Sequence, residues 1–108
     1  MKKIVSLLSV VILFNRCSKA PSACFTYYPS IINAGDVVTF NADCSKNASS
    51  FKWSFGDNTK DTTLNNNNLV SHVYKTSGNF TVKLSASRKD GVTLKKGEPE
   101  KSLMIVVQ

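Results

Sequence analysis

Histidine, tryptophan and acidic side chains are scarce in this chain of 108 residues, which has one His, one Trp and seven Asp or Glu residues. Catalysis needs a positioned nucleophile, an acid–base pair or a metal ion. His72 has no Ser or Cys partner in a recognisable arrangement, and together with two cysteines it does not complete a zinc site. We therefore expect no enzyme, no resident metal and no cofactor.

A hydrophobic run long enough to cross a bilayer, which takes about 20 residues, is also missing. The apolar run at residues 4–14 is eleven residues long and is interrupted by Ser6 and Ser9. It follows a short positive region, Lys2 and Lys3. This order is typical of a secretory signal peptide, so we expect residues 1–16 to be a signal that is removed on export.

A cysteine, Cys17, comes directly after this region. The arrangement resembles the bacterial lipoprotein signal, in which that cysteine is acylated and becomes the first mature residue. The lipoprotein pattern has Leu three residues before the cysteine and a small residue directly before it, where this chain has Phe14 and Arg16. The resemblance implies that Cys17 carries the lipid and that residues 17–21 form a short tether to the membrane.

The resemblance also implies a location, the cell envelope, as an outer-membrane lipoprotein of a bacterium. The alternative is a plain secretory peptide that is cut further along, near Ala20 or Ser22, which would leave the protein secreted.

Basic residues outnumber acidic ones, but part of this excess belongs to the signal. The whole chain has a formal charge of +7, and without residues 1–16 it keeps 11 basic against 7 acidic residues, or +4. Most of the remaining lysines are scattered. A nucleic-acid interface would need a basic face with interleaved aromatic residues, so we expect no nucleic-acid partner.

Two cysteines remain if Cys17 is acylated. Cys24 and Cys44 are 20 residues apart, on what the pattern indicates are the first two strands. Export to an oxidising compartment favours their pairing in a disulfide, which is worth roughly 3 kcal/mol for a loop of this length. Two free thiols are the alternative.

Alternating apolar residues predict an all-β domain over residues 22–108. The clearest signal is Phe51, Trp53 and Phe55, which alternate with polar residues and must share one buried face of a strand. No sustained helical period follows residue 17. The composition of residues 57–68 predicts a long polar surface loop with a short edge strand near residues 62–64. Asp90-Gly91 predicts a hairpin turn. Six or seven short strands point to a β-sandwich.

Three motifs in this domain resemble the PKD domain (polycystic-kidney-disease type). The family pattern is close to W-x-F-G-D, then H-x-Y, then G-x-Y/F-x-V-x-L, and residues 21–108 show these motifs in that order. The chain departs from the pattern at Ser54, where Asp is common, and at Asn58, where Gly is usual. The resemblance implies an immunoglobulin-like β-sandwich of about seven strands, with structural roles for the motif residues Trp53, Phe55, Gly56, Asp57, His72, Tyr74 and Gly78.

The sequence pattern favours structural roles for these residues over catalytic or ligand-binding ones. We interpret His72 as a hydrogen-bonded structural residue and Asp57 as a turn cap, because no D-x-D-x-D spacing supports calcium binding by Asp57 with Asp43 or Asp61. Tyr28 follows Tyr27 in the strand, so the two side chains point to opposite faces. Tyr28 is the better candidate for a surface aromatic residue that stacks on a sugar.

These observations predict a non-enzymatic envelope lipoprotein that consists of one PKD-like domain. We expect it to act in protein or carbohydrate binding or adhesion at the surface, held at the membrane by its lipid, with residues 58–68 as its contact surface. The alternative is an accessory subunit of an envelope-located glycan- or protein-degrading enzyme complex.

Overall fold

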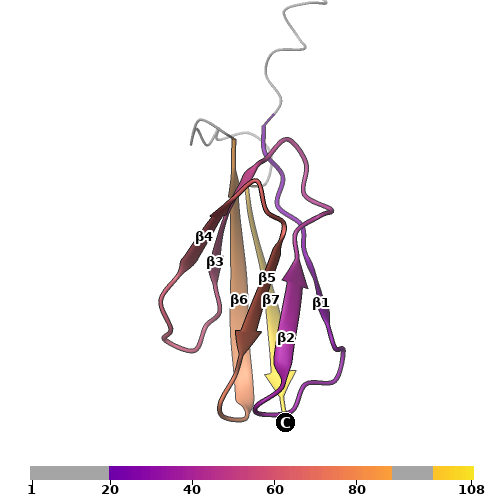
Figure 1. Ribbon diagram of the computed structural model, residues 1–108, viewed down its shortest axis with the longest axis vertical. Coiled ribbons are helices and arrows are strands. Elements are labelled where there is room, and N and C mark those ends of the chain that lie inside the picture. The colour runs from indigo at the N-terminus through magenta and orange to yellow at the C-terminus, as the bar shows by residue number, and fades with distance from the viewer. Residues whose placement is uncertain (1–19, 89–98) are drawn as a thin grey trace, which may run out of the picture.

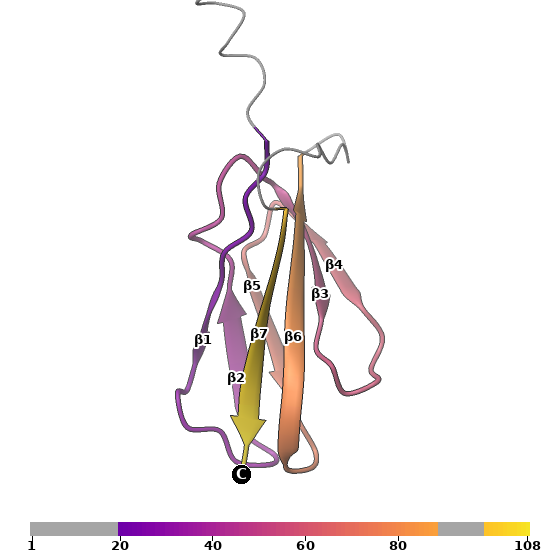
Figure 2. The same cartoon turned by 180° about the vertical axis from the view of Figure 1, so that it is seen from behind.

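Two antiparallel sheets face each other in the computed structural model, which describes residues 20–88 and 99–108 (Figures 1 and 2). In these residues seven strands form. The three-stranded sheet has the order β1-β2-β5, and the four-stranded sheet has the order β4-β3-β6-β7. The bounds are β1 (Thr26–Tyr28), β2 (Val37–Asn41), β3 (Ser50–Ser54), β4 (Thr62–Asn65), β5 (Leu69–Val73), β6 (Gly78–Ser87) and β7 (Glu100–Val107).

This architecture confirms the predicted all-β, immunoglobulin-like sandwich of about seven strands. The chain crosses between the sheets after β2, after β4 and after β5, so each sheet combines segments that are distant in sequence. The predicted edge strand in the polar stretch is β4, which borders the four-stranded sheet. Within the described stretches, no helix is long and apolar enough to cross a membrane.

The core lies between the sheets and is built from the alternating apolar positions. Phe51, Trp53 and Phe55 are all buried, as their parity predicted. The Trp53 ring contacts Phe25 edge-on at 5.2 Å between centroids, and the Phe40 ring at 5.7 Å. Burying side chains of this size is the main source of stability in a small domain.

A short segment between β1 and β2 joins one edge of the three-stranded sheet to the four-stranded sheet. Ile32 is buried and forms a parallel bridge with Val107, the last residue of β7. The backbone N–H of Gln108 donates to the Ile32 carbonyl at 2.8 Å, and the N–H of Ala34 donates to the Gln108 carbonyl at 2.9 Å. The connection between β1 and β2 of the three-stranded sheet is therefore hydrogen-bonded to the end of β7 in the four-stranded sheet.

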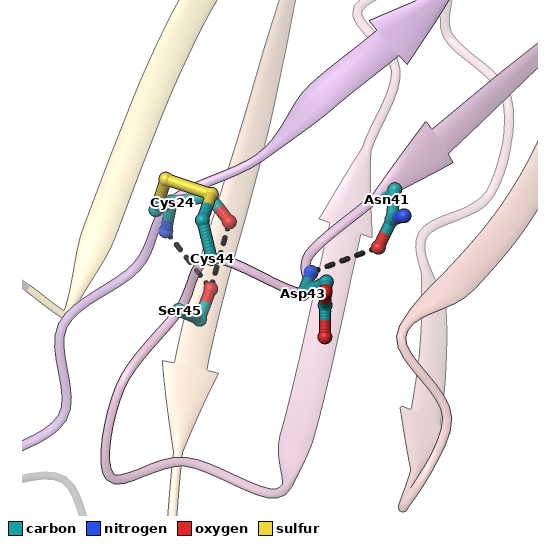
Figure 3. The surroundings of a disulfide bond; sticks show 5 residues. All are labelled: Cys24, Asn41, Asp43, Cys44 and Ser45. Carbon is teal, nitrogen blue, oxygen red and sulfur yellow. Dashed lines mark hydrogen bonds between the residues drawn. A yellow bond between two sulfur atoms is a disulfide. The ribbon is translucent and has the colours of Figure 1, made fainter.

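The disulfide Cys24–Cys44 is present, which confirms the predicted pairing (Figure 3). The expectation that both cysteines lie on strands was wrong, because Cys24 precedes β1 and Cys44 follows β2. At these places the chain has left the ladder, and Ser45 supplies hydrogen bonds instead. Its hydroxyl group accepts from the Cys24 N–H at 2.9 Å and donates to the Cys24 carbonyl at 2.8 Å.

Three predictions concern residues outside the described stretches: the signal peptide at residues 1–16, the acylated Cys17 and the Asp90-Gly91 turn. Of the predicted tether, residues 20 and 21 are described. Pro21 is buried, and the Ala20 carbonyl accepts a hydrogen bond from the side chain of Asn47 at 3.3 Å.

Candidate functional site

The W-x-F-G-D and H-x-Y motifs meet where β3 leads into its turn. Oδ2 of Asp57 lies 2.7 Å from Nε2 of His72, and its Oδ1 accepts hydrogen bonds from the N–H and the hydroxyl group of Thr59, at 3.3 and 2.6 Å. The His72 ring stacks on Phe55 at 4.1 Å between centroids. The Tyr74 hydroxyl donates to the Phe55 carbonyl at 2.8 Å. The cluster ties this turn to β5, which is a structural role.

Two pKa values reflect this packing. Burial by itself raises the pKa of Asp57, but the hydrogen bonds from Thr59 and His72 and the charge of His72 outweigh it and hold the pKa below 3.8. Burial, with a smaller contribution from the Asp57 charge, raises the pKa of Tyr74, so its hydroxyl group stays a donor. The side chains of Asp57 and His72 are each only 14% exposed, which leaves little of either for a ligand.

Gly56 lies so close to the backbone of β6 that there is no room for a side chain. Its φ is +81°, and a Cβ at this position would overlap the backbone carbonyl of Thr81 and lie 2.9 Å from its nitrogen. Asn58, which departs from the family pattern, adopts φ +65°. Asn tolerates the left-handed region better than most residues, so it keeps the turn that Gly forms in the pattern.

The three carboxylates considered as calcium ligands have different neighbours. Asp57 pairs with His72, Asp61 lies 3.6 Å from Lys52 Nζ, and Asp43 lies beside Asn68. Among residues 20–88 and 99–108, no three His, Cys, Asp or Glu side chains gather in a way that could hold a metal ion.

An uncharged surface covers the outer face of the three-stranded sheet, and we call it the platform. Strand register places its side chains in rows, because Tyr28 pairs with Thr39, and Thr39 pairs with Ser71. Tyr28 is 76% exposed, whereas Tyr27 points inward and packs against the core, as parity predicted. The platform comprises Thr26, Tyr28, Val37, Thr39, Asn41, Leu69, Ser71 and Val73.

The outer face of the other sheet carries charged side chains, which the platform lacks. Lys52 faces Asp61, and Lys83 Nζ lies 3.8 Å from Glu100. These exposed pairs are typical of a solvated sheet face and contribute little stability. The contrast makes the platform the better binding surface, because an exposed aromatic ring among apolar and hydroxyl groups loses little hydration when it is covered.

A hollow of about 380 Å³ adjoins one end of the platform, and we call it the asparagine hollow. It is shared by the end of β2, the residues after it and the β4–β5 connection. Asn41 and Leu69 belong both to this hollow and to the platform. Its lining consists of Asn41, Asp43, Asn66, Asn67, Asn68 and Leu69.

The sequence identified parts of this surface but not its whole. Tyr28 was a candidate from parity, and Asn66–Asn68 belong to the stretch predicted as the contact surface. Asn41 and Asp43 were missed as members of the same surface. They are more than 20 residues from the asparagine run along the chain, and only the antiparallel pairing of β2 with β5 brings them beside it.

Comparisons with known proteins agree with this fold. The sequence profile of the PKD domain matches residues 18–100. Seven chains among the solved structures match. One of them is a structure of carbohydrate-binding modules from the β-sandwich superfamily, described for their promiscuous specificity. It is 26% identical, with a TM-score of 0.70, over 83% of this chain and 35% of that one.

This chain therefore spans about a third of the length of that solved chain. No curated protein matches it. The profile match covers most of the sequence. The structure agrees with it, because it has seven strands in two sheets, an Asp57–His72 pair between two of the family motifs, and a buried Trp53. The chain belongs to the PKD domain family.

Proposed function

We propose that this PKD domain is a non-enzymatic binding module that holds a polysaccharide across the platform. The observation that carries the proposal is the 76% exposure of Tyr28 on an uncharged sheet face. Sugar rings have apolar C–H faces and hydroxyl edges. The Tyr28 ring can pack against the apolar face of a sugar. Thr39 and Ser71, which are paired in the same row of the sheet, have hydroxyl groups that can bind the hydroxyl edge.

The platform is formed by paired strands that pack on the core. β2 is the central strand of its sheet and pairs with both neighbours. Beneath it, Phe40 is fully buried and contacts Tyr27 at 6.2 Å between ring centroids. A surface that is ordered beforehand loses less conformational entropy on binding.

The solved carbohydrate-binding modules support the proposal by their fold and by the ligand class that their title names. Both PKD domains and such modules are usually binding domains without catalytic activity.

We propose further that Cys17 is acylated and holds the domain at the cell envelope. The supporting observation is the position of Cys17, directly after the signal-like residues 1–16. A binding module attached in this way would hold polysaccharide close to the cell surface.

Affinity gel electrophoresis tests the platform. The domain is run in gels that contain galactomannan, mixed-linkage β-glucan, arabinoxylan or starch, and we expect at least one to retard it. Tyr28→Ala should weaken that binding about tenfold, because aromatic anchors dominate such interfaces.

Met104→Ala is the matched control, because Met104 is 66% exposed on the other sheet and its loss should leave retardation unchanged. Absence of retardation in every gel would contradict the proposal. So would capture of an envelope protein by the wild type that Tyr28→Ala abolishes, because the platform would then serve a protein partner.

A further inference from the structure

We infer that the asparagine hollow is a second subsite, which selects neutral, hydroxyl-bearing sugar units and excludes anionic ones. The inference rests on the proposed polysaccharide function and names the ligand class. The hollow is continuous with the platform through Asn41 and Leu69, which pair with each other across β2 and β5. It is an open depression of about 380 Å³, which has room for one or two sugar units lying on the surface.

Hydrogen-bond donors line this hollow in a fixed orientation. The amide oxygen of Asn41 accepts from the Asp43 N–H at 2.8 Å, and that of Asn67 accepts from the Leu69 N–H at 3.0 Å. Each bond occupies the oxygen and leaves the NH₂ group on the other side of the amide. Among the described residues neither NH₂ group has a hydrogen-bond partner, so both are available to a ligand.

An acceptor lies beside these donors. Asp43 is exposed, and its Oδ1 is 3.5 Å from the side-chain nitrogen of Asn68, at the outer limit of a hydrogen bond. The carboxylate therefore keeps most of its accepting capacity for a ligand. Bonds to a charged acceptor are stronger than neutral ones.

A hydroxyl group satisfies both halves of this arrangement, because it accepts from an amide NH₂ group and donates to a carboxylate. A uronate or sulfate group has no proton to donate and is repelled by Asp43. No Lys or Arg lines the hollow to offset that repulsion. An ammonium group would leave the two NH₂ donors without an acceptor.

Covalent and backbone bonds fix the walls of the hollow. Asp43 is followed by Cys44, which the disulfide joins to Cys24, and by Ser45, which forms two hydrogen bonds with Cys24 (Figure 3). On the other side, the Asn68 carbonyl accepts from the Ala42 N–H at 2.8 Å, and the Asn66 N–H donates to the Ser49 carbonyl at 2.7 Å. The backbone that carries the donors and the acceptor is therefore held in place before the ligand arrives.

The test compares two forms of one polymer: the neutral polysaccharide that retards the wild-type domain, and its carboxymethylated derivative. The wild type should prefer the neutral form. Asp43→Asn keeps the side-chain volume but removes the charge. It should weaken binding of the neutral form about five- to tenfold and reduce the preference against the carboxymethylated form. Asp61→Asn, which removes a carboxylate directly before β4 of the other sheet, should behave as wild type.

Thermal unfolding of each variant establishes that it is folded. If Asp43→Asn binds both polymers as the wild type does while Tyr28→Ala weakens binding, the hollow is not a subsite and the platform stands. If Asp43→Asn weakens binding and Tyr28→Ala does not, the hollow stands and the platform fails. A wild type that no neutral polymer retards contradicts both.

Discussion

At the scale of single residues, Trp53 is the largest side chain that is fully buried. Its rings pack between Phe25 and Phe40, and its Nε1 has no hydrogen-bond partner among the described residues. Its contribution to stability is therefore packing. Trp53→Ala should lower the free energy of unfolding by about 3–5 kcal/mol, measured by urea unfolding followed by circular dichroism.

The wild-type domain provides a second measurement, because its tryptophan emission should be blue-shifted and poorly quenched by iodide. Met104→Ala is the control, with an expected change of at most about 0.5 kcal/mol. An emission spectrum typical of exposed tryptophan would contradict the burial of Trp53.

Gly56 and Gly35 form a natural comparison, because both have positive φ, +81° and +94°. A Cβ on Gly35 would meet nothing within 4 Å, whereas one on Gly56 would overlap the Thr81 backbone. Gly35→Ala should cost about 1–2 kcal/mol from backbone strain alone, and Gly56→Ala about 1–3 kcal/mol more from overpacking. Chemical denaturation of the two variants measures the difference, and equal losses would show that Thr81 moves away easily.

The Asp57–His72 pair predicts a pH dependence of stability. The pKa of Asp57 is lower in the folded state than its ordinary value of 3.8. The stabilisation by its charged form is thus complete above about pH 4 and is lost as the pH falls through the folded-state pKa. Unfolding free energies measured from pH 5 to pH 2 should fall less steeply in Asp57→Asn than in the wild type. Parallel curves would mean that other carboxylates account for the acid sensitivity.

At the scale of elements, the disulfide connects the segment before β1 to the segment after β2. Closing a loop of this length contributes roughly 3 kcal/mol by restricting the unfolded chain, which is large for a small domain. Reduction should therefore lower the melting temperature by about 10 °C or more, measured by calorimetry with and without reductant.

Mass spectrometry is the direct check, because the oxidised protein should be two mass units lighter than the reduced one. Labelling of both Cys24 and Cys44 by a thiol reagent in natively exported protein would contradict the pairing.

Strand faces were predictable from sequence because side-chain alternation is a local property. The parity of Phe51, Trp53 and Phe55 identified the buried face, and that of Tyr27 and Tyr28 identified the inward and outward tyrosines. Strand ends were less predictable. Cys24 and Cys44 lie beyond their strands, and at Cys24 hydrogen bonds to Ser45 replace the ladder. Alternation does not reveal where a ladder stops.

At the scale of the whole molecule, membrane attachment is predicted to depend on Cys17. A single acyl chain binds a bilayer weakly, whereas two or more anchor stably at about 0.8 kcal/mol per buried CH₂ group. The lipoprotein resemblance implies two or three chains. Cys17→Ser should release the domain into the soluble fraction, and high salt applied to the wild type should not, because the attachment is apolar.

Fractionation of the cells expressing each form measures this. Membrane-bound Cys17→Ser, or a wild type that is already soluble, would show that the protein follows the ordinary secretory route past Arg16.

The sequence by itself determined the fold class, the family and the buried face of each main strand, because these depend on alternation and on motifs within short segments. Only the tertiary structure decided which residues together form the proposed binding surface. Tyr28, Asn41 and Leu69 come from three strands, and Asp43 and Asn67 from two connections. They share a surface because β1, β2 and β5 pair in one register, and pairing between distant segments is set by the packing of the whole chain.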